Sequence, residues 1–263
     1  MEKFVCAIDA GTTSNRAILF DKDSKIVGIA QKEFTQYFPQ PGWVEHDAEE
    51  ILTNTYKAVK QLVRENIAEN DRIVSVAITN QRETVVVWDK RTGKPVYNAV
   101  VWQCNRGTQI CEDLIAQGHE PTVTVKTGLI INPYFSASGV KWILDNVENA
   151  RKDAEEGHLL LGTMDCWLIW NLTGGKIHAT DYTNASRTLL FNIHTLDWDQ
   201  ELLDLFTIPV SMLPQALASD DIYGATTFDG LISEVPIAGV LGDSHGALAG
   251  QMCFTPGMGK ATY

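Results

Sequence analysis

The pattern of hydrophobic and polar positions at the start of the chain predicts an antiparallel sheet. Residues 4–8 form an apolar run that ends at Asp9, and residues 17–20 form a second apolar run. Mostly glycine, hydroxyl and other polar residues separate the two runs, which is the pattern of a hairpin. Residues 25–34 then alternate in the same way after a turn-forming pair. We therefore expect three consecutive strands here.

The next periodic segment has the spacing of a helix. Asp47, with Glu50 three residues later, has the form of a capping box, in which each side chain bonds a backbone N–H group of the other residue. Apolar residues then recur at helical spacing, at Ile51, Leu52, Tyr56, Val59, Leu62 and Val63. The pattern predicts a helix over residues 48–66.

Further along the chain, short apolar runs alternate with helical patterns. Residues 73–78 are expected to form a buried parallel strand, and residues 235–241 a late apolar strand. Shorter extended segments are expected at 84–88 and 96–101. Periodicity and flanking glycines predict helices at 110–115, 140–147, 164–172, 199–205 and 246–252. Strands interleaved with helices in this way indicate an α/β fold.

Composition places the chain among globular proteins without a nucleic-acid surface. Its 263 residues are 44% hydrophobic and 21% charged, which is enough for one large or two modest domains with a substantial core. The 21 basic residues are outnumbered by 33 acidic residues, and the formal charge is −12. This balance argues against a nucleic-acid surface and for a soluble protein that meets anions only at a local site.

Targeting signals and cysteine content indicate the cytoplasm. The first residues lack a basic segment and a long apolar core, and no run approaches the length of a membrane span. The five cysteines are odd in number and include no close CxxC pair; they are Cys6, Cys104, Cys111, Cys166 and Cys253. Reduced thiols are therefore expected, in a cytoplasmic protein with no membrane insertion.

The tip of the predicted hairpin carries groups that can hold a phosphate. Gly11 allows a turn in which successive N–H groups face one concavity, and the hydroxyls of Thr12, Thr13 and Ser14 can add hydrogen bonds. Asp9 would repel a neighbouring phosphate unless a divalent cation lay between them. An ordinary polar turn with Asp9 as a local cap is the alternative, and composition alone favours it.

A second carboxylate stands at the end of the late apolar strand. Asp243 follows that strand as Asp9 follows the first, and ligands of open α/β sheets lie at such strand ends. Capping of the following helix is the alternative role for Asp243. Other phosphate motifs fail, because no GxGxxG follows a strand and Ala261 replaces the hydroxyl residue that a Walker loop needs after Gly259-Lys260.

Five short motifs follow one another along the chain, namely residues 9–16 (DAGTTSNR), 78–84 (ITNQRET), 132–134 (NPY), 181–188 (DYTNASRT) and 242–243 (GD). Together they resemble the FGGY carbohydrate-kinase family. The second and fourth motifs resemble the members that phosphorylate glycerol, rather than those that phosphorylate pentuloses. The resemblance runs through the whole chain.

The resemblance implies a fold and a division of work between two domains. Family members have an α/β, ribonuclease-H-like fold, similar to the actin and hexokinase ATPases, in which helices flank a mixed central sheet. Two such domains enclose the active site. Residues 1–263 match only the N-terminal, substrate-binding domain, and the C-terminal adenine-binding domain is absent. The fragment alone is therefore expected to be inactive, and the full-length enzyme is expected to be a homo-oligomer.

The implied activity is the ATP-dependent phosphorylation of glycerol to sn-glycerol 3-phosphate, with Mg²⁺ as the metal. By resemblance, Asp243 is the catalytic base that accepts a hydroxyl proton, and Asp9 and Asp243 hold the Mg²⁺. The glycerol site would be formed by Arg82, Glu83, Trp102, Tyr134, Asp243 and Ser244. The ATP phosphates would contact Thr12, Thr13, Ser14 and Arg16.

Several of these roles have alternatives. Arg82 and Glu83 could form a solvated pair at a strand end, and Tyr134 and Trp102 could be packing residues. Ser244 stands where the family usually has glutamine, so a pentulose or another polyol is an alternative substrate. A non-catalytic, truncated polyol-binding protein is the third hypothesis.

Overall fold

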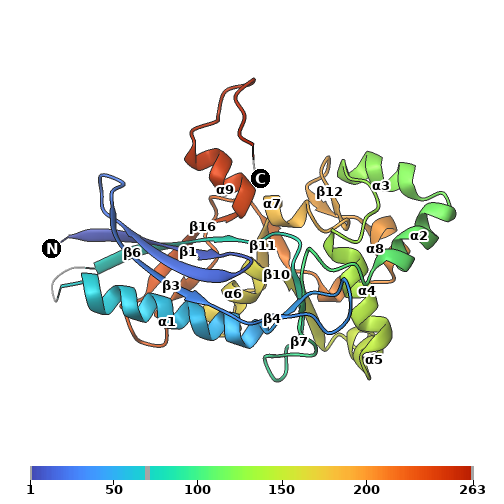
Figure 1. Cartoon of the computed structure of the whole chain (residues 1–263), viewed down its shortest axis with the longest axis horizontal. Coiled ribbons are helices and arrows are strands. Elements are labelled where there is room, and N and C mark those ends of the chain that lie inside the picture. The colour runs from blue at the N-terminus through green and yellow to red at the C-terminus, as the bar shows by residue number, and fades with distance from the viewer. Residues whose placement is uncertain (1, 69–71, 262–263) are drawn as a thin grey trace.

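A computed structural model describes residues 2–68 and 72–261, and its centre is a six-stranded mixed sheet (Figure 1). In order across the sheet, the strands are β15 (Ala225–Thr226), β16 (Val235–Gly242), β6 (Arg72–Asn80), β1 (Lys3–Ala10), β2 (Ser14–Phe20) and β3 (Ile26–Glu33). Strands β1, β2 and β3 pair antiparallel, whereas β6 pairs parallel with both β1 and β16. The three opening strands, the buried parallel strand and the late apolar strand are thus confirmed.

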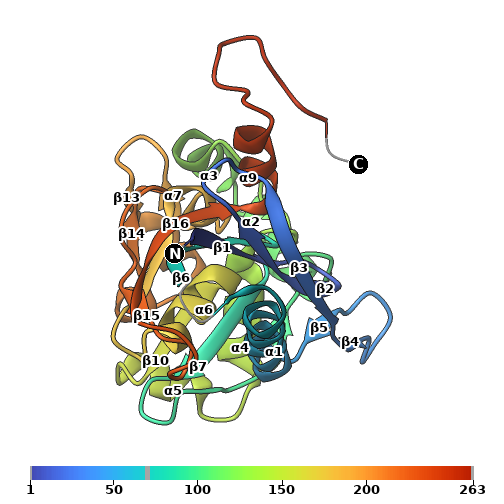
Figure 2. The same cartoon turned by 90° about the vertical axis from the view of Figure 1, so that its left-hand side faces the viewer.

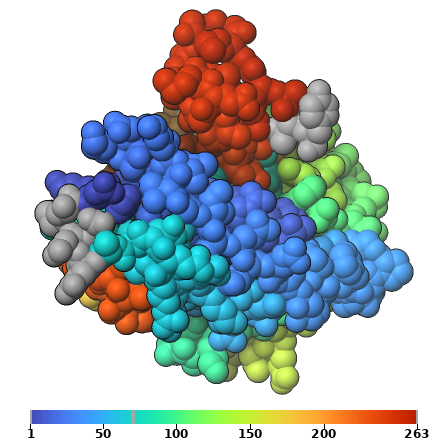
Figure 3. Space-filling view, turned by 60° about the vertical axis from the view of Figure 1, so that its left-hand side comes forward, coloured from blue at the N-terminus to red at the C-terminus, as the bar shows by residue number. Residues whose placement is uncertain are grey.

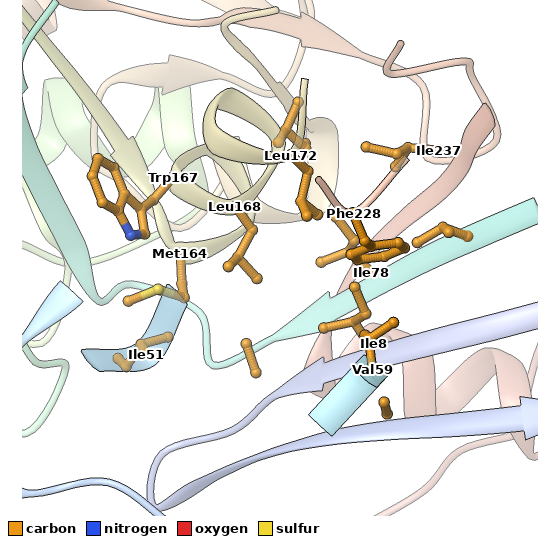
Figure 4. Close-up of a cluster of buried hydrophobic side chains, with 14 of the residues drawn as sticks. Ile8, Ile51, Val59, Ile78, Met164, Trp167, Leu168, Leu172, Phe228 and Ile237 are labelled. Carbon is orange, nitrogen blue, oxygen red and sulfur yellow. The ribbon is translucent and has the colours of Figure 1, made fainter. Parts of the chain in front are cut away.

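One face of this sheet is covered by helices α1 (Ala48–Asn66) and α6 (Met164–Leu172), as Figure 2 shows. Alternate residues of β1 point to that face and are at most 2% exposed: Phe4, Cys6, Ile8 and Ala10. In Figure 4, Ile8 and Ile78 from the strands lie in one cluster with Leu168 of α6. The alternation that predicts the strands therefore also decides which face of the sheet carries the core.

Helix α1 has the predicted bounds, and Asp47 is its N-cap. The Asp47 carboxylate accepts the backbone N–H groups of Glu49 and Glu50, at 2.8 and 3.1 Å. The reciprocal half of the predicted capping box is wrong, because the Glu50 carboxylate accepts hydrogen bonds from Thr35. Glu50 therefore ties the start of α1 to the segment that follows β3.

Replacing Asp47 by alanine should lower the free energy of unfolding by about 1 kcal/mol, because two N–H groups lose their acceptor. Chemical denaturation followed by circular dichroism measures this change. Glu49→Ala is the control, since it removes an exposed acidic side chain from the same helical turn without removing the cap. Equal stability of the two variants would contradict the capping role.

A second six-stranded sheet, with mostly shorter strands, organises the other half of the fold. Its strands are, in order, β10 (Leu159–Thr163), β7 (Val85–Asp89), β9 (Ala99–Val100), β5 (Glu45–His46) and β4 (Gln36–Tyr37), with β8 (Lys94–Pro95) beside β7. In Figure 1, five helices gather in this half: α2 (Thr108–Ala116), α3 (Glu120–Thr127), α4 (Ser136–Asn146), α5 (Ala150–Glu155) and α8 (Gln200–Phe206). This half has its own cluster of buried hydrophobic residues.

The remaining elements are short. They are the strand pairs β11 (Ala179–Asp181) with β14 (Gln215–Leu217) and β12 (Phe191–Asn192) with β13 (Asp197–Trp198), and the helices α7 (Tyr182–Ala185), η1 (Val210–Met212) and α9 (Asp243–Gly250). Within residues 2–68 and 72–261, none of the helices combines the length and the apolar character that a bilayer span requires.

Some predicted bounds need correction. Helix α4 begins at Ser136 rather than at residue 140, and α9 begins at Asp243 rather than at residue 246. The extended segment predicted over 96–101 is a strand only at Ala99–Val100. Helices α3 and α5 and strand β10 were not predicted. The local pattern is weak in these short segments, and tertiary packing decides their structure.

The opposite face of the central sheet is largely uncovered. Strands β1 and β3 leave Val5, Val27 and Ile29 at 38%, 41% and 54% exposure. Figure 3 shows the segment that begins with α9 projecting above the N-terminal strands. Asp9 and Arg16 also lie on this uncovered face, because their positions alternate with buried neighbours. The open side of the sheet is therefore where a ligand can reach them.

Candidate active site

Three parallel strands end at the same edge of the central sheet. Ala10 at the end of β1 and Gly242 at the end of β16 are both register partners of Asn80, the last residue of β6. The residues that follow these strands therefore converge, as they do at the carboxyl edge of other parallel sheets. Two predicted site residues, Arg82 and Asp243, meet at this edge and form an ion pair of 3.1 Å.

Asp9 and Asp243 line one open cavity of about 430 Å³ on the uncovered face of the sheet. Burial raises the pKa of Asp9, the Arg16 guanidinium 3.4 Å away opposes this shift, and the negative charge of Asp243 adds to it. Two carboxylates that face one cavity and repel each other are a donor set that suits a hard divalent cation. The prediction that both residues hold Mg²⁺ is compatible with this geometry.

Asp243 uses only one of its carboxylate oxygens for hydrogen bonds within the described residues. Its Oδ1 accepts Nε–H of Arg82 at 3.1 Å and the backbone N–H of Ser244 at 2.6 Å. The N-cap of α9 is Gly242, which has no side chain, so Asp243 is not the cap of this helix. The Asp243 side chain is 46% exposed, and its Oδ2 is therefore available to a ligand.

Glu83, Trp102 and Tyr134 line a second, small cavity of about 10 Å³. The rings of Trp102 and Tyr134 meet edge to face with centroids 5.6 Å apart. Glu83 is 3% exposed, and burial raises its pKa against the opposing effect of Arg187. The alternative of a solvated surface pair is wrong for Glu83, because a carboxylate this deep in the fold is not a surface group.

The turn between β1 and β2 is fixed by side-chain amides. Gly11 donates its N–H to the Ser14 carbonyl at 3.1 Å, so this amide is not free for a phosphate. The Gly11 carbonyl accepts Nε2–H of Gln81, and the Thr12 carbonyl accepts Nε2–H of Gln36. Thr13 is exposed and Thr12 is half-buried, whereas Ser14 is 4% exposed. Of the predicted phosphate contacts, Ser14 is thus the least accessible.

His46 orients both of these amides and was not predicted as a site residue. Burial lowers its pKa to about 4, so the ring is neutral at pH 7. Its Nε2 lies 2.7 Å from Oε1 of Gln36, which can only accept, and its Nδ1 lies 3.3 Å from Nε2 of Gln81. The proton is therefore assigned to Nε2. A single histidine on a two-residue strand gives no signal of this role in the sequence.

Arg187 is a second residue that the sequence predictions missed. Its Nε donates to Oε1 of Glu83 at 2.6 Å, and its guanidinium lies 4.9 Å from the centroid of the Phe135 ring. The guanidinium also lies 5.9 Å from the centroid of the Tyr134 ring, so Arg187 bridges Glu83 and Tyr134. Arg187 belongs to the motif at residues 181–188, so the motif could have marked it as a site residue. Its contact with Glu83 could not be predicted, because the two residues are 104 positions apart.

The wall of the small cavity also reaches the turn that carries the predicted phosphate contacts. Trp102 donates its indole Nε1–H to the hydroxyl of Thr12 at 3.1 Å. The alternative in which Trp102 and Tyr134 are only packing residues does not account for this polar contact or for their half-exposed rings. The structure thus brings the predicted site residues to one edge of the central sheet and to the region next to it, with Glu83 and Ser14 buried.

Comparison with known proteins extends this picture. Residues 4–250 match the N-terminal domain of the FGGY family of carbohydrate kinases. The chain is 58% identical over 263 residues to a glycerol kinase of Desulforamulus reducens and 57% identical to a glycerol kinase of Carboxydothermus hydrogenoformans. These matches cover 100% of this chain but 52% and 53% of the relatives, so the chain spans about half the length of the curated relatives it matches.

Solved structures of carbohydrate kinases also match this chain. The Plasmodium falciparum glycerol kinase with ADP matches with a TM-score of 0.92 and 35% identity, over 96% of this chain and 51% of that chain. A xylulose kinase of Lactobacillus acidophilus matches with a TM-score of 0.85 over 94% of this chain and 50% of its own, and at 22% identity it shows the fold alone. The predicted actin/hexokinase-like ATPase fold is confirmed. The chain belongs to the FGGY family of carbohydrate kinases.

Proposed function

We propose that residues 1–263 form the substrate-binding N-terminal domain of an ATP-dependent glycerol kinase, which makes sn-glycerol 3-phosphate. One observation carries the proposal: Arg82, Glu83 and Asp243 converge beside Trp102 and Tyr134, in a chain 58% identical to a glycerol kinase. The predicted cytoplasmic location and homo-oligomeric full-length form belong to the same proposal. So does the predicted requirement for a second, adenine-binding domain.

Glycerol is proposed to bind over the mouth of the small cavity rather than inside it. A volume of about 10 Å³ is near the minimum for one water molecule, so a triol needs the space in front of Trp102 and Tyr134. Arg82 and Glu83 would then hold its hydroxyls, and the aromatic wall would contact its carbon chain. Asp243 Oδ2, which no described donor contacts, would accept the proton of the reacting hydroxyl.

ATP is proposed to approach from the open face of the sheet. Thr12, Thr13 and Arg16 would contact its phosphates there, and Ser14 would act mainly through the backbone of the turn because its side chain is buried. Mg²⁺, held by Asp9 and Asp243, would neutralise phosphate charge during transfer. Hydrogen bonds from Gln36, Gln81 and His46 keep the turn in place before the nucleotide arrives.

The proposal can be tested with a fusion protein, called here the joined kinase, in which residues 1–263 are followed by the C-terminal half of the Desulforamulus reducens glycerol kinase. A coupled assay should show glycerol-dependent release of ADP. Glycerol should be preferred over D-xylulose and other polyols; preference for a pentulose would favour the alternative substrate that Ser244 leaves open. The 263-residue chain alone should show no turnover, because phosphoryl transfer requires both substrates to be held in line.

Arg82→Ala should weaken glycerol binding by roughly tenfold to a hundredfold, because loss of a hydrogen bond from a charged donor costs about 1.5 to 3 kcal/mol. Isothermal titration calorimetry of the joined kinase measures the dissociation constant. Arg91→Ala is a matched control, since Arg91 pairs with Asp89 on the surface, away from the site. Unchanged glycerol affinity in Arg82→Ala would remove this residue from the proposed site.

A further inference from the structure

Helix α7 lies against the strand ends that carry the proposed active site, and a fully buried carboxylate precedes it. Asp181 is 0% exposed and is the N-cap of α7. Its two oxygens accept from five donors: Thr183 N at 3.0 Å, Thr183 Oγ1 at 2.7 Å, Asn184 N at 2.9 Å, Asn184 Nδ2 at 2.8 Å and Ser219 Oγ at 2.7 Å. A carboxylate offers about four lone-pair sites, so Asp181 is saturated. Its hydrogen bonds fix the orientation of two side chains of α7.

The first of these side chains reaches the end of β16. A threonine hydroxyl has one proton, and Thr183 donates this proton to Oδ2 of Asp181. Its lone pairs must therefore face other donors, and the hydroxyl oxygen accepts the backbone N–H of Gly242 at 2.9 Å. Gly242 immediately precedes Asp243. Two hydrogen bonds thus connect a buried charge to the backbone that carries the proposed catalytic base.

The second side chain reaches the end of β6. Asn80 Nδ2 donates to Asn184 Oδ1 at 2.9 Å, and Asn184 Nδ2 donates to Asn80 Oδ1 at 3.1 Å. Both residues are 0% exposed, and Asn80 also bonds the carbonyl of Gln81, which precedes Arg82. Because Gly242 and Asn80 are register partners, α7 holds both strands at the point where their ladder ends. The ion pair of Arg82 with Asp243 closes the ring of contacts.

We propose that Thr183 is a positioning residue for Asp243, and that Asp181 sets the direction of its hydroxyl. The link to catalysis rests on the proposed function, whereas the hydrogen-bond relay itself does not. Without the relay, the N–H group of Gly242 would lose its partner at the end of the sheet, and the backbone before Asp243 would gain freedom. Groups that react in line must be held within a fraction of an ångström, so such freedom lowers the rate of the reaction.

The direct test is amide hydrogen exchange at Gly242, measured by NMR in the 263-residue chain. Thr183→Val keeps the shape of the side chain but removes the acceptor, and exchange at Gly242 should become roughly tenfold faster. Thr183→Ser keeps the hydroxyl and should restore slow exchange. Ser219→Ala is the matched control, because it removes a bond of 2.7 Å to the same oxygen of Asp181 but none to β16. It should leave Gly242 unchanged.

Glycerol calorimetry on the same variants adds the functional readout. Thr183→Val should weaken binding, and Thr183→Ser should restore it, because Arg82, which is proposed to bind glycerol, is paired with Asp243. This calorimetry uses the joined kinase; if the unaltered joined kinase binds no glycerol, the proposed function fails, while the exchange result in the 263-residue chain still decides the relay. Equal exchange at Gly242 in Thr183→Val and Thr183→Ser would overturn the proposal. Fast exchange of Gly242 in the unaltered chain would overturn it as well, even if Thr183→Val does not fold.

Discussion

Replacement of Asp243 by asparagine should lower the kcat of the joined kinase by roughly a hundredfold to ten-thousandfold, the usual contribution of a general base. The amide has the shape of the carboxylate, and its oxygen can still accept Nε–H of Arg82, so the local geometry should persist. It cannot accept the proton of a substrate hydroxyl. The KM for glycerol should therefore change much less than kcat.

Steady-state kinetics and a thermal melt of the same preparation test this prediction. The melt shows whether Asp243→Asn is folded, so that lost turnover is not misread as lost structure. Asp220→Asn is the control, since it makes the same chemical change at an exposed turn. A kcat close to that of the unaltered enzyme would exclude Asp243 as the base.

Asp165→Asn should change how the stability of the domain depends on pH. Asp165 is 0% exposed, and its two oxygens lie 2.6 and 2.7 Å from the hydroxyl oxygens of Thr163 and Thr180, which can donate to the ionised carboxylate or accept from the protonated acid. Burial, together with the nearby negative charge of Asp181, raises the pKa of Asp165 from 3.8 to about 7. An asparagine can replace the protonated acid there, because the threonine hydroxyls can accept as well as donate.

Whether stability rises or falls with pH depends on whether the folded or the unfolded chain binds the proton more tightly. Between pH 3.8 and about pH 7, Asp165 is ionised in the unfolded chain but protonated in the folded chain. The free energy of unfolding therefore falls as pH rises through this range and is constant above it. Asparagine has no such proton. The free energy of unfolding of the variant, relative to that of the unaltered chain, should therefore increase by on the order of 4 kcal/mol as the pH rises from 4 to 8.

Urea denaturation at several pH values measures this difference. His46 and His178, whose pKa values burial lowers to about 4, act in the opposite direction over part of the same range. Their contribution cancels when the variant and the unaltered chain are compared at each pH. A difference in the free energy of unfolding that does not vary with pH would show that Asp165 is ionised in the folded protein.

Local patterns predicted the fold well where the decisive residues are close in sequence. Helix α1 has the predicted bounds because its cap, Asp47, and its apolar face lie within one segment. Helix α3 was missed because Val123 and Val125 alternate with threonines, a spacing that favours a strand. Its helical state depends on tertiary packing of Val123 and on a left-handed glycine, Gly128, at its end.

For the candidate site too, the sequence predicts the residues with a local pattern and misses contacts between distant residues. The two carboxylates Asp9 and Asp243 were found because each follows an apolar strand, and strand ends converge in a parallel sheet. The contact between Arg187 and Glu83 joins residues 104 positions apart, and no spacing rule predicts it. The role of Thr183 depends on a hydroxyl proton whose direction only the folded structure fixes.

Trp102 contacts two parts of the candidate site at once. Its ring forms a wall beside Tyr134, and its indole N–H bonds the hydroxyl of Thr12 on the turn between β1 and β2. Indole fluorescence responds to the polarity around the ring and to its hydrogen bond. A ligand bound beside either region is therefore expected to alter the emission of this ring, and a ligand that displaced the ring would change the affinity of the other region. Under the proposed function, Trp102 would therefore report on coupling between the proposed glycerol and ATP sites.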